Sequence, residues 1–132
     1  MDKQNGPVDE KAIVNSERQV QEYADNLATQ LRKGFLAYCV LLICQNKAVY
    51  TSDIIASLRN ADMVVVEGTI YPLLNRLQKD GLLSYEWQES EQGPPRKYYV
   101  ITKFGRQVVE ALKKQISDLN KALKSIGKGE LK

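Results

Sequence analysis

The chain has 132 residues, a hydrophobic share of 43% and a net charge of +3, which suit one small globular domain with room for an appended helix. It has no histidine, so the commonest general base and zinc ligand is missing. Its charge is uneven, because residues 1–30 carry a net −3, residues 31–102 a net +1 and residues 103–132 a net +5. This balance excludes a strongly basic nucleic-acid coat, so any contact with DNA would depend on local charge or on two copies acting together.

The N-terminus and the longest apolar run predict a cytoplasmic protein. Residues 1–10 are polar and mixed in charge, unlike a signal peptide. The apolar run from Phe35 to Cys44 is too short to span a bilayer and suits a buried core helix. The spacing of Cys39 and Cys44 matches neither a metal knuckle nor a redox CxxC motif, so we expect two buried thiols in a reducing compartment.

Residues 1–30 are expected to form an N-terminal extension that contains an amphipathic helix. Ser16 opens a capping-box pattern, although the helix could begin earlier, near Asp9. Gly34 is the expected position of a bend before a more apolar helix that ends near Cys44. Apolar side chains recur at three- and four-residue steps on the first part of this segment: Val20, Tyr23, Leu27 and Leu31.

Two shorter helices should follow, joined by a connector over residues 61–66. Thr51 or Ser52 can cap the first of them, which should end near Asn60. The second is predicted from about Glu67 to Asp80, and Gly81 supplies its stop. The buried side of the second helix follows the i, i+3, i+4, i+7 pattern: Ile70, Leu73, Leu74 and Leu77.

The opposite side of the helix over 67–80 is the candidate recognition surface. Proline is comfortable only in the first turn of a helix, so Pro72 predicts an irregular or bent start. At 100° per residue, one exposed strip is predicted, flanked by Tyr71 and Arg76: Gly68, Pro72, Asn75 and Lys79.

A two-stranded hairpin is predicted after Gly81. Leu83, Tyr85 and Trp87 alternate with polar residues, as in a half-buried strand, and we expect Trp87 to belong to the core of this wing. Residues 93–95, Gly-Pro-Pro, close the hairpin, and the prolines restrict the backbone that carries Arg96 and Lys97.

The last helix is predicted from about Lys103 to Ile126. Its apolar residues form a heptad-like seam that a small domain would not cover completely, so self-association is the simplest account. The alternative is packing on the N-terminal helix of the same chain. The predicted dimer-interface residues are Val109, Leu112, Ile116, Leu119, Leu123 and Ile126.

Several motifs in fixed order resemble the PadR-like transcriptional regulators. They are the segment from Gly68 to Leu77, the Gly-Leu-Leu at 81–83, Trp87, the Gly-Pro-Pro-Arg-Lys-Tyr-Tyr at 93–99, and the Thr-Lys-Phe-Gly-Arg at 102–106. The resemblance covers roughly residues 30–110. It implies a mainly α fold with a small β-hairpin: a winged helix-turn-helix domain over 31–102, and a C-terminal dimerisation helix and tail over 103–132.

The resemblance implies a homodimer that binds an approximately palindromic operator in double-stranded DNA and represses transcription until an unidentified small-molecule effector releases it. We expect no enzyme activity, catalytic residue, metal site or cofactor, because no pattern in the chain supports one. The candidate DNA-binding residues are Gly68, Thr69, Tyr71, Asn75, Arg76, Lys79, Arg96 and Lys97.

The sequence also permits other interpretations of these residues. Gly68 could serve close helix packing, Tyr71 could seal the start of its helix, and Arg76 could form a surface ion pair. The wing that carries Arg96 and Lys97 could be a solvated hairpin. The near-neutral charge of residues 31–102 also permits a winged-helix protein-interaction module that does not bind DNA.

Overall fold

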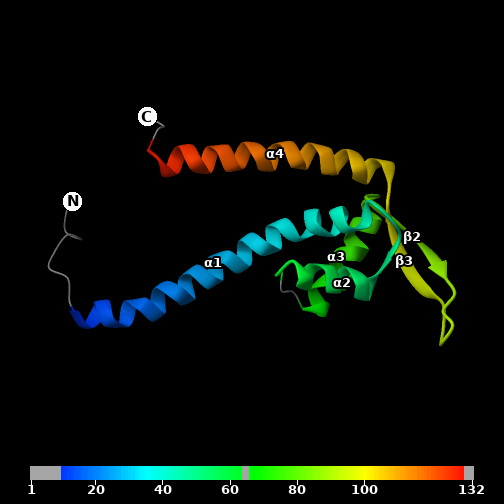
Figure 1. Cartoon of the computed structure of the whole chain (residues 1–132), viewed down its shortest axis with the longest axis horizontal. Helices are drawn as coiled ribbons and strands as arrows, with labels where there is room; N and C mark the ends of the chain where they lie inside the picture. The colour runs from blue at the N-terminus through cyan, green and yellow to red at the C-terminus, as the bar shows by residue number, and fades with distance from the viewer. Residues whose placement is uncertain (1–9, 64–65, 130–132) are drawn as a thin grey trace. The chain divides into compact units, whose positions relative to one another are not determined.

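A computed structural model describes residues 10–63 and 66–129 of the chain (Figure 1). The described residues form mainly helices with one small antiparallel sheet, which confirms the predicted fold class. The chain divides into two compact units, residues 1–35 and residues 36–132. The second unit contains the whole sheet and the helices around it. The elements in chain order are α1 (Glu10–Cys44), β1 (Val49–Tyr50), α2 (Thr51–Asn60), α3 (Glu67–Lys79), β2 (Leu83–Gln88), β3 (Arg96–Ile101) and α4 (Lys103–Gly127).

Helix α1 spans Glu10–Cys44 and so begins close to the earlier of the two expected starts. It continues through Gly34, because one glycine costs a helix only about 1 kcal/mol relative to alanine. From Ser16 to Cys44 it is long and apolar enough to cross a membrane, by length and composition alone. That stretch is longer than the apolar run noted in the sequence. Its C-terminal part is nevertheless core, since Leu36, Val40, Leu41 and Cys44 are buried in the second unit.

Strand β1 was not predicted, and it changes how α2 begins. Tyr50 is the N-cap residue of α2 and also pairs with Tyr98 of β3, so the strand runs directly into the helix. No side chain caps the helix, and the prediction that Thr51 or Ser52 would do so is wrong. Thr51 is instead the first helical residue and is buried.

Helices α2 and α3 both end in a Schellman arrangement. After α3, Gly81 has a φ of 85°, its N–H bonds to Gln78 O at 3.0 Å, and the next N–H bonds to Leu77 O at 2.9 Å. After α2, Asp62 occupies the same position with a φ of 62°, and aspartate tolerates this left-handed region better than most residues do. The predicted stop at Gly81 is therefore confirmed, whereas the matching stop at Asp62 carries no glycine signal.

Pro72 lies inside α3, which is helical without interruption from Glu67 to Lys79. The expected irregularity at the start is limited to a tight first turn, in which Thr69 N–H bonds to Val66 O at 2.9 Å, three residues back. Pro72 is exposed, so its ring extends into solvent rather than into the core. The predicted buried side is confirmed: Ile70, Leu73, Leu74 and Leu77 are all buried.

The sheet has the strand order β1-β3-β2, with both pairings antiparallel. Leu83, Tyr99 and Ile101 lie on the face that packs into the core and are buried. The expected half-buried pattern of β2 fails after Leu83, since Tyr85 is 40% exposed and Trp87 is 62% exposed. The outer part of the hairpin extends beyond the helices, so no helix covers this part of β2 and Trp87 is not core (Figure 1).

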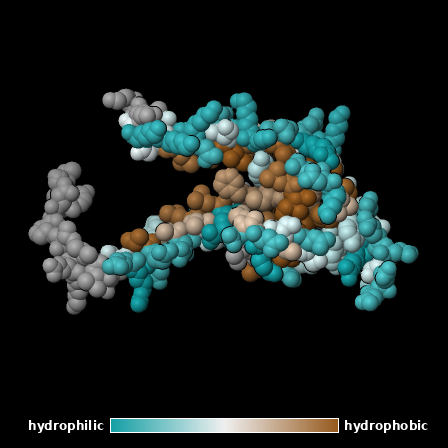
Figure 2. All heavy atoms as spheres, viewed as in Figure 1, coloured by the Kyte–Doolittle hydropathy of each residue, from teal (hydrophilic) through white to brown (hydrophobic). Residues whose placement is uncertain are grey.

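Helix α4 is tied to the rest of the second unit near its start. Val109 is buried in the common core, and the guanidinium of Arg106 donates a hydrogen bond of 2.8 Å to Gln45 O, just after α1 ends. Further along, hydrophobic residues gather on one side of α4, whereas its other side is hydrophilic (Figure 2). Leu112 and Ile116 are half-buried, and the last three seam residues are exposed: Leu119, Leu123 and Ile126.

Candidate nucleic-acid interface

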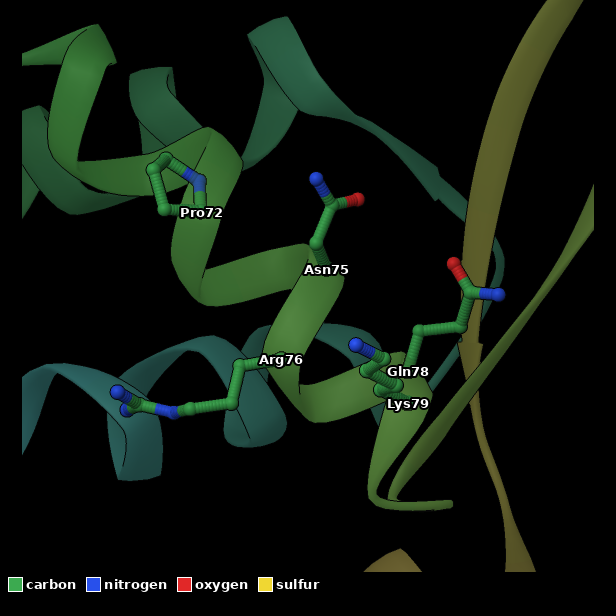
Figure 3. Close-up of a pocket in the computed structure, with 5 residues that line it drawn as sticks. All are labelled: Pro72, Asn75, Arg76, Gln78 and Lys79. Carbon is green, nitrogen blue, oxygen red and sulfur yellow. The ribbon is translucent and has the colours of Figure 1, made fainter.

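The exposed strip of α3 lies where the helical periodicity placed it. Tyr71 is 50% exposed, and Asn75, Arg76 and Lys79 are all exposed on the side away from the buried leucines. Figure 3 shows that Gln78 reaches toward the strands, whereas Arg76 extends away from them. A surface hollow on this helix presents amide, guanidinium and ammonium groups, and its lining residues are Pro72, Asn75, Arg76, Gln78 and Lys79.

These groups suit DNA by their chemistry. Asparagine and glutamine amides can donate and accept on the edge of adenine, and arginine or lysine can donate to guanine or to phosphate. Among the described residues, Lys114 and Asp118 form an ion pair, whereas Arg76 and Lys79 form none with a described carboxylate. The ion-pair interpretation of Arg76 therefore has no support in the fold.

Gly68 lies in the first turn of α3 and is exposed. A Cβ built on Gly68 would meet no atom within 4 Å, so close packing within the described chain does not require a glycine there. Thr69 is half-buried beside it. The first N–H groups of a helix lack intrahelical partners and favour an anion, although in α3 the Thr69 N–H already bonds to Val66 O.

Lys97 joins the wing to α3. Its ammonium lies 4.1 Å from the centre of the Tyr85 ring and 5.3 Å from the centre of the Tyr99 ring. It also donates a hydrogen bond of 3.3 Å to Gln78 Oε1 in the last turns of α3. Two rings and an amide thus hold the half-buried Lys97 side chain between the two elements, so its charge has a defined position.

Arg96 lies on the opposite face of β3, because successive side chains alternate across a strand. Its guanidinium carbon is 4.9 Å from the centre of the Tyr50 ring, and Tyr50 in turn packs on Tyr98 with ring centres 5.7 Å apart. A second surface hollow at the tip of the wing brings Arg96 and Tyr98 together with Glu89, Ser90, Glu91 and Gln92. The outer side of the wing is therefore mixed in charge.

Three residues that hold this site together were not singled out in the sequence: Tyr50, Gln78 and Tyr85. Period-two alternation placed Tyr85 on a strand face, but the partner across the strand depends on the hairpin register, here Tyr85 opposite Tyr99. Tyr50 reaches Arg96 only through the unpredicted strand β1. No local sequence signal would have identified these contacts.

The predicted dimer-interface residues differ in exposure along α4. Val109 is buried within its own chain, so it serves the core, and Leu112 and Ile116 are half-buried. Leu119, Leu123 and Ile126 are more than half exposed. In the first unit, α1 carries its own exposed apolar stripe: Val20, Tyr23, Leu27 and Leu31.

Neither metal nor thiol chemistry is indicated by the part of the chain that the structure describes. No group of three histidine, cysteine, aspartate or glutamate side chains there could hold a metal ion. Both cysteines are free thiols. Burial raises the pKa of Cys44 to about 12 and also raises the pKa of Cys39, so both thiols are protonated at neutral pH.

Comparison with known proteins agrees with this geometry. The model of the transcriptional regulator PadR-like family matches residues 40–111. The structure of a PadR-like transcription factor from Bacteroides fragilis is 50% identical in sequence, covers 76% of this chain and 98% of its own, and has a TM-score of 0.66. A PadR family transcriptional regulator from Eggerthella lenta is 28% identical, with coverages of 83% and 96% and a TM-score of 0.77.

A PadR-like transcriptional regulator from Bacillus cereus is 34% identical, covers 74% of this chain and 95% of its own, and has a TM-score of 0.65. No curated protein matches the chain. The family match covers more than half of the chain, and the relatives are transcription regulators rather than enzymes. The chain belongs to the PadR-like family of transcriptional regulators.

Proposed function

We propose that the protein is a homodimeric, sequence-specific DNA-binding regulator that places α3 in the major groove and its wing beside the adjoining backbone. The observation that carries this proposal is the two-sided character of α3. Its apolar side is buried, and its exposed strip presents Asn75, Arg76 and Lys79 without a carboxylate partner among the described residues. The candidate base-edge contacts come from Asn75 and Arg76, and the phosphate contacts from Lys79, Arg96 and Lys97.

The start of α3 has a separate role in this proposal. Gly68 lets a phosphate approach the backbone N–H groups of the first turn, since no atom of the described chain lies where its side chain would be. The hydroxyls of Thr69 and Tyr71 flank that position and can donate to phosphate oxygen.

Self-association completes the binding unit. Leu119, Leu123 and Ile126 of α4 are exposed at three- and four-residue steps, which is the pattern of a helix seam. A two-fold dimer would present two α3 helices to half-sites about 34 Å apart, one turn of the duplex, on an approximately palindromic operator. Leu112 and Ile116 belong to the same seam, closer to the core.

Repression in the cytoplasm is the regulatory outcome that we propose. A dimer that occupies an operator blocks access of the polymerase to the promoter. Family membership supports this role, together with release by a small-molecule effector that changes the angle between the subunits. A change in that angle alters the spacing of the two α3 helices, so it would lower DNA affinity without unfolding either subunit.

The DNA proposal is tested with a labelled duplex from the region upstream of the protein's own gene. Titration is followed by fluorescence anisotropy at several salt concentrations, and log K should fall steeply and linearly with log salt. Arg76→Ala should weaken binding by about tenfold or more, as expected for a lost base contact. Lys113→Ala, an exposed lysine on α4, is the matched control and should change the affinity less than twofold.

Two outcomes would count against the proposal. Binding that is insensitive to salt, or no binding to DNA at all, would favour the winged-helix protein-interaction module instead. The dimer is tested by sedimentation, in which Leu123→Lys should shift the protein toward monomer. A monomeric wild type at concentrations that bind DNA would remove the two-fold operator from the proposal.

A further inference from the structure

Tyr85 and Trp87 form an exposed aromatic pair on β2. Their ring centres are 6.0 Å apart and the rings meet edge to face at 85°. Trp87, the single tryptophan of the chain, is 62% exposed. Large aromatic residues at a surface are commonly part of an interface, because they combine apolar area with a polar edge. A binding partner could therefore cover this aromatic pair, since the wing itself does not cover it.

The hairpin register shows which face of the sheet carries this pair. Leu83 lies opposite Ile101, Tyr85 opposite Tyr99, and Trp87 opposite Lys97. Residues opposite one another across two strands share a face. The face begins in the core at Leu83 and continues outward through Tyr85 to Trp87 and Lys97. We call the exposed part, Tyr85, Trp87 and Lys97, the inner wing face.

The inner wing face adjoins the exposed strip of α3. Lys97 lies over the Tyr85 ring and bonds to Gln78, and the half-buried Gln78 lines the same surface hollow of α3 as Lys79. A strand of DNA backbone that leaves α3 at Lys79 would therefore meet Lys97 and Trp87 next.

Charge distinguishes the two faces of the wing. Glu86 pairs with Tyr98 on the outer face, and the loop acids Glu89 and Glu91 gather with Arg96 and Tyr98 on that side. The inner wing face carries the ammonium of Lys97. An anionic partner thus fits the inner face better than the outer one.

We propose that the inner wing face binds the sugar–phosphate backbone of duplex DNA, with Trp87 packed on a deoxyribose and its indole N–H donated to a phosphate oxygen. This inference rests on the proposed DNA-binding function and adds a contact residue to it. Deoxyribose offers an apolar C–H surface beside a strong acceptor, and indole offers a flat apolar ring with one donor. Lys97 faces the same phosphate run.

The single tryptophan makes the test direct. Unlabelled upstream duplex is added while Trp87 emission and its quenching by acrylamide are recorded, and a labelled copy of the same duplex reports binding by anisotropy. The expected result is a change in emission, with acrylamide quenching reduced at least twofold, over the concentration range of the anisotropy rise. An anisotropy rise with unchanged emission and quenching would overturn the inference and leave the DNA-binding proposal standing.

Two other outcomes would also reject the inference about the inner wing face. Without an anisotropy rise, the proposed function fails and the inference fails with it. If the tryptophan becomes protected when the protein alone is concentrated, before any DNA is added, the face is occupied by a second copy and the inference is wrong.

Variants separate the role of the ring from that of charge. Trp87→Ala should weaken DNA binding about fivefold to tenfold while leaving the slope of log K against log salt unchanged, since no charge is lost. Trp87→Phe should recover part of the loss. Gln88→Ala, the neighbour on the opposite face, is the control and should stay within twofold of wild type. An equal loss in both alanine variants, or no loss in Trp87→Ala, would contradict the proposed contact.

Discussion

The hydroxyl of Thr102 donates a hydrogen bond of 2.6 Å to the carbonyl oxygen of Gly81, and so joins the start of α4 to the end of α3. The hydroxyl oxygen of Thr102 also accepts a hydrogen bond of 2.9 Å from the N–H of Gly105 and so caps α4. One side chain thus satisfies backbone groups at the ends of two helices. The bond therefore links the end of α3, which carries the exposed polar strip, to the first turn of α4, the helix that carries the apolar seam.

Thr102→Val should lower the free energy of unfolding by about 1–2 kcal/mol, because the isosteric side chain loses the cap and the bond to Gly81. Urea unfolding followed by circular dichroism measures the change. Thr102→Ser keeps the oxygen and should retain most of the stability. A valine variant as stable as wild type would show that water replaces both bonds without cost.

Gly105→Ala should destabilise the second unit by about 3 kcal/mol or more, or prevent folding. A Cβ on Gly105 would overlap the carbonyl oxygen of Leu82 and lie 2.7 Å from a side-chain carbon of Ile101, and the backbone carbonyl cannot move aside cheaply. Thermal and urea unfolding provide the measurement.

Gly127→Ala is the matched control for Gly105→Ala, because Gly127 belongs to the same helix and nothing lies within 4 Å of its Cβ position. It should be neutral or stabilising by up to about 1 kcal/mol through helix propensity. Similar behaviour of the two variants would contradict the close approach of α4 to the start of β2.

Gly68→Ala should lower DNA affinity without lowering the stability of the fold. The added methyl group meets no atom within 4 Å and favours the helix, so stability should stay equal or rise by up to about 1 kcal/mol. DNA affinity should nevertheless fall, because the methyl group blocks the approach of a phosphate to the first turn of α3. Gly34→Ala, a helical glycine with equally open surroundings, serves as the control. Unchanged DNA binding in Gly68→Ala would remove this turn from the interface.

Cys44 should make stability depend on pH above about 9. Burial raises its pKa from 9.0 to about 12, so between these values the folded protein keeps a proton that the unfolded chain loses. The contribution of the buried, protonated Cys44 thiol to the free energy of unfolding is fully present below pH 9 and decreases as pH rises toward 12. Cys44→Ala lacks this contribution, so the stability difference between wild type and variant should shrink from pH 8 to pH 11.

Urea midpoints for wild type and Cys44→Ala at each pH give that difference directly. Titrating lysines and tyrosines are present in both proteins, so their effects largely cancel. A difference that stays constant from pH 8 to pH 11 would show that Cys44 ionises without regard to folding.

Local patterns were sufficient to place α2, α3, α4 and the exposed strip of α3, but they did not show that α1 continues through Gly34 without interruption. The positions of Ile70, Leu73, Leu74 and Leu77 define a buried side whatever they pack against, so the opposite side follows from helical geometry alone. The stop at Gly81 follows in the same way from the preference of glycine for positive φ. These features depend on residues within a few positions of one another.

Only the tertiary structure decided the surroundings of the wing. Trp87 has the alternation of a half-buried strand, yet it is exposed, because the helices cover β2 only near Leu83. Lys97 reaches Gln78 and Tyr85, and Arg96 reaches Tyr50, through pairings that join distant parts of the chain. Periodicity tells which side of an element is apolar, but what covers that side depends on how far the neighbouring elements extend.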